Sequence, residues 1–362
     1  MKPVDSISVS VVQHKLESIV EEMDAVIKRA VYPYCADTSR HFASAIFDGL
    51  GRLVTQSRQV PQCLGALSMA VQSSREFFEN NLRSGDIYLL SDPYCGCTNQ
   101  QELILISPVF AGVDDVPAFW TLSRSQRFYH AEIESVGEIT PRSLQISPLK
   151  LYDGGVARDD VLQMVLANIY RPGEFKGELQ AMIGSNRVAE QRLSHLLETW
   201  DATRLQRAID MVLDRSDGLS RNRISRWDDG VYVSESHLQG RHYGNNKTCI
   251  RAIVTKKSDS IHVDLTESDR QLQTAGNATY ANTVAAIHRA LVSVMGPGII
   301  RNEGFFRPVG LTTKPGTVIH PLAPAPVTSC PDLPGRKIHD AVYRALSAAR
   351  SGSGGLCVSN SH

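Results

Sequence analysis

Apolar residues near the start of the chain recur at two different spacings, and each spacing predicts a different element. One set lies three to four positions apart, the spacing of a single helix face: Val12, Leu16, Ile19, Met23 and Val26. It predicts an amphipathic helix over residues 9–31. Residues 43–56 instead hold two short apolar runs around Asp48-Gly49 and Gly51, which is typical of a β-hairpin.

The same two patterns alternate along the rest of the chain. Helices are expected at 64–82, through most of 158–226, at 280–295 and at 336–349. Strands are expected at 86–90, 103–110, 117–122, 231–238, 249–255 and 260–268, followed by Pro- and Gly-rich strands up to about 327. Residues 123–157 show little periodicity and many turn formers, so a long ordered loop is expected there.

This order of elements predicts an α+β fold in several parts. We expect an N-terminal α+β domain with a mixed sheet over residues 1–157, which carries the site, and a helical insert over 158–227. A C-terminal β-rich domain is expected over 228–350. Residues 351–362 are expected to form a flexible tail, because SGSGGLCVSNSH offers nothing to pack.

Composition and charge exclude several classes of protein. Lys and Arg number 38 and Asp and Glu number 38, so no basic surface for nucleic acid or an anionic membrane is predicted. No run approaches the roughly 20 apolar residues that span a bilayer, and MKPVDSISVS lacks a signal-peptide core, so a cytoplasmic location is expected. The 7 cysteines are irregularly spaced, which predicts reduced thiols, and the pair Cys95 and Cys97 has no second pair to complete a zinc site.

Six segments of the chain, taken in order, resemble one protein family. They are LESIVEEMDAVIKRA in the opening helix, the hairpin FASAIFDGLGRLVTQ, RSGDIYLLSDPYCGCT, LANIYRPGEFKGELQAMIGSNRVAEQRL, IHVDLTESDRQ and RNEGFFRPV. Through them the chain resembles the hydantoinase B/oxoprolinase family, which includes ATP-dependent N-methylhydantoinase and oxoprolinase subunits and the alpha subunit of acetone carboxylase. The resemblance covers nearly the whole chain, but the family continues into a Gly-rich C-terminal region, so this chain is expected to be short at that end.

The resemblance implies a subunit of an ATP-linked cyclic-amide hydrolase, or of a related carboxylase, within an oligomer. A hydantoinase A-like partner subunit would use ATP to phosphorylate a small-molecule substrate, and this chain would carry out the later step. The sequence fits an external ATP source, because its stretch SGSGG at 351–355 lacks the Lys-Ser/Thr of a phosphate-binding loop.

The resemblance also marks three places for a site. The family's G-G-T-H-x-x-D segment falls on residues 96–102, where Asn99 replaces the His and Glu102 replaces the Asp. Its H-H-x-D segment is here Tyr129-His130-Ala131-Glu132, and its acidic residue before the hairpin falls near Asp37. Asn is a poor ligand for a transition metal, so the family's metal site is largely rewritten in this chain.

The remaining residues are candidates for two kinds of role. As ligands for a divalent metal such as manganese, iron or zinc they are Glu102, His130, Glu132 and Asp37. As catalytic groups they are His130, Glu102 and Tyr129, since an ordinary histidine pKa of about 6.5 suits proton transfer. Plainer interpretations stay open, namely a hydrogen-bonded histidine at His130 and an ion pair of Glu102 with Arg124 or Arg127.

Neighbouring residues admit two interpretations as well. Asp92 and Tyr94 are interpreted as architectural residues of a turn. Cys95 and Cys97 are nucleophiles if a base lowers a thiol pKa, and otherwise small packing residues. The Asn186-Arg187 pair either contacts substrate or partner or lies on the surface.

Two other functions stay open beside the cyclic-amide hydrolase. The first is a repurposed, metal-independent biosynthetic enzyme, in which His130, Tyr129 and a cysteine carry the chemistry. The second is a non-catalytic subunit that only binds a partner, because the family's ligands have been rewritten. One fold hosts many functions, so kinship alone does not choose among them.

Overall fold

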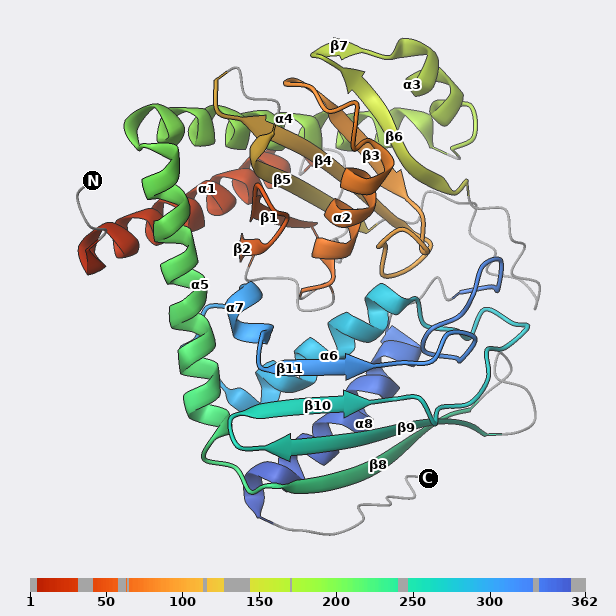
Figure 1. Ribbon diagram of the computed structural model, residues 1–362. Helices are drawn as coiled ribbons and strands as arrows, with labels where there is room; N and C mark the ends of the chain where they lie inside the picture. Colours follow the sequence, from red (N-terminus) through yellow and green to blue (C-terminus); the bar gives the residue numbers. More distant parts are fainter. Residues whose placement is uncertain are drawn as a thin grey trace. The chain divides into compact units, whose positions relative to one another are not determined.

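The computed structural model describes residues 5–31, 42–57, 63, 65–112, 116–126, 144–169, 171–239, 247–327 and 332–352. The chain divides into two compact units, which are described separately here (Figure 1). Unit 1 comprises Met1–Val60, Leu67–Cys97 and Gln101–Leu213, and unit 2 comprises Pro61–Ala66, Thr98–Gln100 and Asp214–His362. Helices and two sheets together confirm the predicted α+β class. The three-domain division and the tail predicted from the sequence stay predictions.

Unit 1 is built on a seven-stranded sheet in the order β2-β1-β5-β4-β3-β6-β7. Its strands all pair antiparallel, so the sheet of the N-terminal part is antiparallel rather than mixed as predicted. Its strands are β1 (Phe42–Asp48), β2 (Leu53–Gln56), β3 (Ile87–Ser91), β4 (Glu102–Phe110), β5 (Pro117–Gln126), β6 (Ile146–Asp153) and β7 (Val156–Ala157). The predicted hairpin is confirmed as β1 and β2, which turn at Asp48, where the carboxylate accepts the backbone N–H groups of Leu50 and Arg52.

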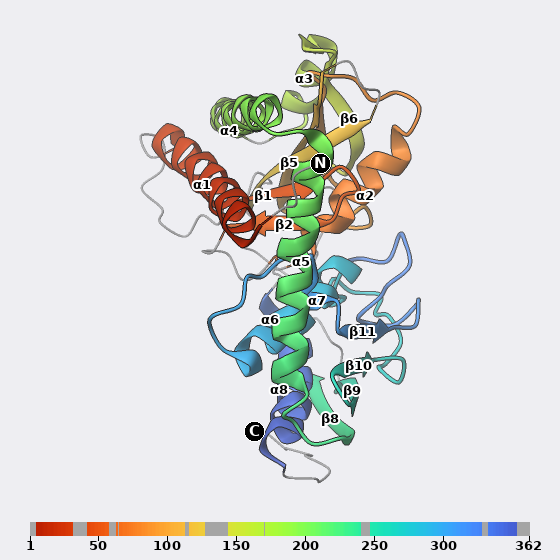
Figure 2. The same cartoon turned by 60° about the vertical axis from the view of Figure 1, so that its left-hand side comes forward.

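Helices cover both faces of this sheet (Figure 2). The helices of unit 1 are α1 (Ser6–Val31), α2 (Leu67–Phe77), α3 (Asp159–Leu166), α4 (Pro172–Thr199) and α5 (Ala202–Ile224), the last of which passes into unit 2 after Leu213. Helices α1 and α4 lie side by side on one face, and α2 lies on the other. Helices therefore shield both faces of the sheet from solvent, which explains why all but the last residue of β4 are buried.

Alternation along β4 assigns its side chains to the two faces. Leu103 and Leu105 belong to the core cluster that includes Phe175, Leu179 and Met182 of α4. Successive side chains of a strand point to opposite faces, so Glu102, Ile104 and Ile106 point to the face that α2 covers. Glu102, the first residue of β4, therefore lies on the same face of the sheet as the turn that follows β3.

One stretch predicted as a loop is partly strand, and that prediction is wrong for residues 123–126, 146–153 and 156–157. Strand β5 continues to Gln126 through four polar residues that are buried or nearly so, and β6 pairs with β3. Buried polar side chains hid both strands from the hydrophobic pattern. In β6 the charged Lys150 is buried because its ammonium lies 3.0 Å from Asp86 and 2.9 Å from Asp153.

Unit 2 is a four-stranded sheet in the order β11-β10-β9-β8, parallel only between β10 and β11. Its strands are β8 (Gly230–Leu238), β9 (Thr248–Lys257), β10 (Ser260–Asp264) and β11 (Val309–Thr312). Its helices are α6 (Tyr280–Met295), the short α7 (Glu303–Phe306) and α8 (Asp332–Ser351), and they confirm the helices predicted at 280–295 and 336–349.

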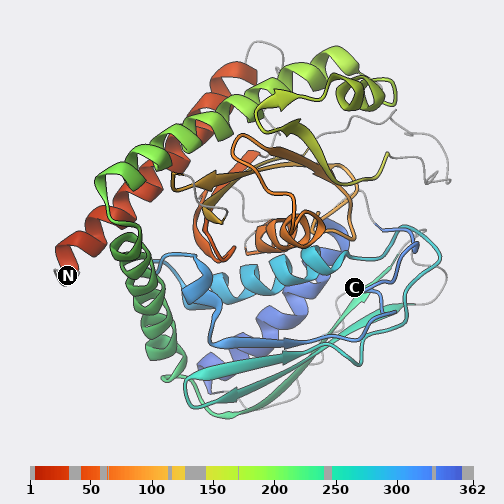
Figure 3. The same cartoon turned by 45° about the horizontal axis from the view of Figure 1, so that its top comes forward.

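Helices α6 and α8 cover one face of the sheet of unit 2 (Figure 3). Every second residue of β8 and β9 is buried against them, and the residues between are half-exposed or exposed on the outer face. This pattern is the expected one for an antiparallel sheet with one covered face. Among the described residues, no helix is both long and apolar enough to cross a membrane.

Candidate functional site

The turn after β3 is organised by Asp92. Its Oδ1 accepts the N–H of Tyr94 at 2.8 Å, and its Oδ2 accepts the hydroxyl of Ser147 at 2.8 Å. Its backbone carbonyl accepts the N–H groups of Cys95 at 3.1 Å and Cys97 at 3.3 Å. The architectural interpretation of Asp92 is confirmed, because one side chain and its own carbonyl satisfy most of the turn's donors.

Gly96 lets this turn lie against α2. Its φ is +115°, and a Cβ built on it would lie 2.5 Å from the backbone nitrogen of Ala70. Both features demand glycine, since other residues rarely adopt this φ and no side chain fits the space. The turn of the family motif is therefore fixed to the helix that covers this face of the sheet.

The two cysteines of the turn are poor nucleophiles in this geometry. Burial, with help from Asp92, raises the pKa of Cys95 to about 11. Burial, with help from Glu102, raises the pKa of the fully buried Cys97 well above its ordinary value. The thiolate is the reactive form, so the packing interpretation is favoured over the nucleophile.

Glu102 forms a buried ion pair with Arg124. The two side chains are 0% exposed, and Arg124 Nε donates to Glu102 Oε1. Arg124 also donates through Nη2 to Gln126 Oε1 at 3.0 Å. In the sheet, Glu102 lies directly opposite Gln126 and diagonal to Arg124 on the same face. The pairing of Glu102 with Arg124, one of two partners expected from the sequence, is confirmed, while Arg127 lies outside the described residues.

The other predicted site residues lie outside the described residues. Tyr129, His130 and Glu132 fall in 127–143, and Asp37 falls in 32–41. Asn99, which stands where the family has a histidine, is fully buried, and its Nδ2 donates to Thr98 Oγ1 at 3.3 Å. Of the predicted set, only Glu102 therefore has a described environment.

That environment tests whether Glu102 fits a metal. One carboxylate oxygen is engaged by a guanidinium that is itself fully buried, and this cation repels a second one at the same carboxylate. A ligand for a divalent ion needs the carboxylate charge that Arg124 already neutralises. As placed, Glu102 does not fit the metal role, and we derive no chemical step through a metal there.

A second set of buried polar groups joins α4 to the opposite face of the sheet. Glu178 accepts the hydroxyl of Ser125, and Asn186 Nδ2 donates to Ser107 Oγ at 3.1 Å and to the carbonyl of Leu105 at 3.4 Å. Asn186 is fully buried, so its interpretation as a surface residue is wrong. The signal that could have identified Glu178 is its spacing, because it lies on the same helix face as the apolar residues of α4.

Arg187, the neighbour of Asn186, is occupied within unit 1. Its Nη1 lies 2.8 Å from Glu190, its Nη2 donates to the carbonyl of Gly85 at 3.4 Å, and its guanidinium lies over the ring of Tyr152. Arg187 therefore links α4 to the residues just before β3. These contacts give no support to a role for Arg187 in binding a substrate.

Asp24 on α1 is a half-buried carboxyl group that sequence reasoning missed. Its Oδ1 accepts the hydroxyl of Ser57 at 2.7 Å, and burial raises its pKa, while bonds from Ser57 and Ser44 oppose the rise. It lies between Met23 and Ile27, which belong to the buried face of the helix. The sequence signal for Asp24 was a polar residue among the apolar residues of one helix face.

Comparison with known proteins identifies the family of this chain. The profile of Hydantoinase B/oxoprolinase matches residues 5–361. The chain belongs to the hydantoinase B/oxoprolinase family. It is 27% identical to the beta subunit of the caprolactamase of Pseudomonas jessenii over 96% of this chain and 61% of the relative. It is also 27% identical to the B-type subunit of the putative D-/L-hydantoinase of Pseudomonas sp. (strain NS671) over 96% of this chain and 62% of the relative.

A solved structure of a family member has the same fold. The crystal structure of the ATP-dependent caprolactamase from Pseudomonas jessenii superposes with a TM-score of 0.88 at 26% identity, covering 96% of this chain and 61% of the other. The chain thus spans about three-fifths of the length of these curated relatives. The predicted family is confirmed.

Proposed function

We propose that this chain belongs to a subunit of an ATP-linked cyclic-amide hydrolase that works with a hydantoinase A-like partner, which uses the ATP. The observation that carries the proposal is the likeness to an ATP-dependent caprolactamase over 96% of the chain at a TM-score of 0.88. Two relatives are each named as one subunit of an enzyme, which supports a partner subunit here. The net reaction opens one ring C–N bond with water, coupled to conversion of ATP and water to ADP and phosphate.

Residues near the end of β5 are our candidates for the proton transfers of ring opening. The leaving ring nitrogen needs a proton, and histidine is suited to supply it near neutral pH. His130 and Tyr129 follow Gln126 by four and three residues in the chain, and Gln126 lies opposite Glu102 in the sheet. We assign the proton transfers to His130 and Tyr129, and we assign Glu102 a positioning role through Arg124.

The metal-independent alternative gains support from one observation. Arg124 supplies the positive charge beside Glu102 that a metal ion at Glu102, His130, Glu132 and Asp37 would otherwise supply. This alternative is tested by treating the active complex with a chelator. Activity that survives supports it, while activity that is lost and restored by manganese, iron or zinc contradicts it.

The proposed hydrolase is tested on the full-length natural protein purified together with its hydantoinase A-like subunit. Lactams, hydantoins and 5-oxoproline are supplied with ATP, and ADP and ring-opened amino acid are measured together. We expect ring-opened product and ADP in equal amounts for at least one class. His130→Ala and Tyr129→Phe should abolish or strongly lower turnover, whereas His14→Ala, at an exposed position of α1, should not.

Two results would contradict this proposal. The first is a complex that hydrolyses no ATP in response to any of these cyclic amides. The second is unchanged turnover in both the His130 and the Tyr129 variant, with the complex intact by size-exclusion chromatography. The second result would favour the non-catalytic subunit whose role is to hold a partner.

A further inference from the structure

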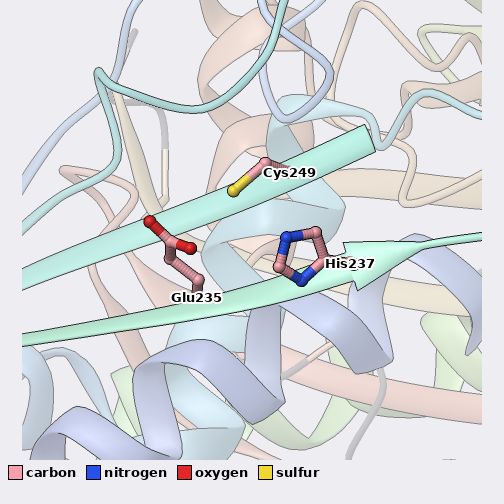
Figure 4. Close-up of side chains that lie close together, drawn as sticks. All are labelled: Glu235, His237 and Cys249. Carbon is pink, nitrogen blue, oxygen red and sulfur yellow. The ribbon is translucent and has the colours of Figure 1, made fainter. Parts of the chain in front are cut away.

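Three side chains with different ligand atoms converge on the outer face of the sheet in unit 2 (Figure 4). Glu235 and His237 lie on β8, and Cys249 lies on β9. One carboxylate oxygen, one imidazole nitrogen and the sulfur all lie within 4.8 Å of one another. All three residues are half-exposed, so solvent and ions can reach them.

Strand register creates this convergence. His237 and Cys249 are direct partners in the antiparallel pair of β8 and β9, and Glu235 lies two residues before His237 on the same face. The alternate residues Leu238 and Ile250 point the other way and are fully packed in the core of unit 2. Packing on the covered face of the sheet thus fixes the backbone that carries the three side chains.

Asp269 fixes the position of Cys249 further. Its Oδ2 accepts the backbone N–H of Cys249 at 2.6 Å, and its own N–H donates to the carbonyl of Cys249 at 3.0 Å. These bonds hold the first residues of β9 in place without occupying the sulfur.

The charges around the sulfur favour a cation. The carboxylates of Glu235 and Asp269 place negative charge near the sulfur of Cys249, and Arg251 places positive charge there. Arg251 divides its guanidinium between Glu235 Oε1 at 3.1 Å and Glu267 at 3.2 Å. Among the described residues, Arg251 contacts only Oε1 of the Glu235 carboxylate. Arg251 is partly exposed, unlike Arg124, and can keep Glu267 as its partner.

We propose that Glu235, His237 and Cys249 bind a zinc ion. Carboxylate oxygen, imidazole nitrogen and thiolate sulfur are the donor atoms of zinc sites, and the soft thiolate selects zinc over manganese or magnesium. Tetrahedral zinc places its ligand atoms about 3.5 Å apart. Small rotations of half-exposed side chains achieve this from the present spacing. Three protein ligands leave the fourth position to water.

Binding involves one covalent change and no redox step. The Cys249 thiol loses its proton to solvent as the zinc–sulfur bond forms, and His237 and Glu235 donate lone pairs. The site shares no residue with the proposed hydrolase site, so it does not rest on the proposed function.

The test uses cobalt as a spectroscopic substitute for zinc. The full-length protein is stripped with a chelator, the chelator is removed, and cobalt is titrated before zinc. We expect one cobalt ion per chain with a sulfur-to-cobalt charge-transfer band in the near ultraviolet, and we expect zinc to abolish that band. The band reports a sulfur ligand, which none of Glu102, His130, Glu132 and Asp37 supplies, and variants must then assign it to one cysteine.

Variants assign the band to its ligands. Cys249→Ser should remove it, while Cys95→Ser is the matched control, because that thiol is also half-buried. His237→Ala should keep the sulfur but weaken cobalt binding at least about a hundredfold, since even changes behind a ligand cost 10- to 100-fold. Circular dichroism checks that each variant is folded.

Three outcomes would overturn the proposal: no thiolate band in the unaltered protein, a band that persists in Cys249→Ser, or a band that is lost in Cys95→Ser. Metal binding is measured without turnover. A failed hydrolase assay therefore leaves the zinc result standing, and a failed cobalt titration leaves the hydrolase assay standing.

Discussion

The ion pair of Glu102 and Arg124 yields the sharpest prediction about stability. Arg124→Met keeps much of the side-chain volume but removes the guanidinium. Glu102 would then be left in a fully buried position without the cation that accepts its charge. The substitution also removes the bond from Arg124 to Gln126.

The expected loss in the free energy of unfolding is large. It is set mainly by the desolvation of the charge left on Glu102, and less by the lost attraction to Arg124. Removing one partner of a buried ion pair costs about 3–5 kcal/mol, since the remaining charge stays desolvated. A whole protein is typically stable by only about 5–15 kcal/mol. The double variant Glu102→Gln/Arg124→Met removes both charges and should recover at least about 2 kcal/mol of the loss.

The assay is urea unfolding at neutral pH, followed by tryptophan fluorescence. Trp120 is fully buried in the same strand as Arg124, so its signal reports on unit 1. Slopes as well as midpoints must be compared, because a chain with two units need not unfold in one step. Arg158→Met, which breaks an exposed pair with Asp160, is the matched control and should change the midpoint too little to resolve.

The reasoning would be refuted in either of two ways. Arg124→Met would behave like Arg158→Met, or the double variant would be no more stable than the single one. Either result would mean that Glu102 is not held as a buried charge by Arg124. The positioning role proposed for Glu102 would then fail as well.

Three further predictions concern other residues of unit 1. Gly96→Ala should destabilise unit 1 by about 1–3 kcal/mol in thermal unfolding, because of its positive φ and the clash with Ala70; an unchanged midpoint would contradict the close approach. Asp24 has a raised pKa, so the stability supplied by its protonated form is present below the ordinary value of 3.8 and is lost as pH rises through the raised value. Asp24→Asn should therefore stabilise the protein at neutral pH, with the gain shrinking as the pH falls towards 3.8; a gain independent of pH would be inconsistent with this. Asn186→Ala should cost about 1–3 kcal/mol in urea unfolding, since it removes the bonds from α4 to β4, and a loss no larger than that of an exposed substitution would count against them.

Regular apolar spacing made most of the fold predictable. The helix over 9–31 and the hairpin over 43–56 coincide with α1, β1 and β2, because each buries a continuous apolar face. Apolar spacing did not predict the segments whose buried side chains are polar. The end of β5 buries Ser123, Arg124 and Ser125, and these residues have partners on neighbouring strands and helices that no local spacing reveals.

The two candidate sites differ in how far the sequence could predict them. The turn before Glu102 was identified through family motifs, and one of its expected pairings, with Arg124, is confirmed. His237 and Cys249 are twelve residues apart in the chain, and neither belongs to a recognisable ligand motif. Alternation on strands predicted at 231–238 and 249–255 gives the face of each side chain, but the register that makes them partners depends on tertiary pairing.

Two arginines beside carboxylates lead to opposite conclusions about metals in this chain. Arg124 is fully buried, so an ion at Glu102 would have to displace a cation that is already held out of water beside it. Arg251 is partly exposed and already has Glu267 as a second partner, so it can stay paired with Glu267 when an ion binds Glu235. A metal bound by the purified protein should therefore be lost in Cys249→Ser, and chelator effects on turnover should be measured in that variant. Metal that persists there would instead support the site expected from the sequence at Glu102, His130, Glu132 and Asp37.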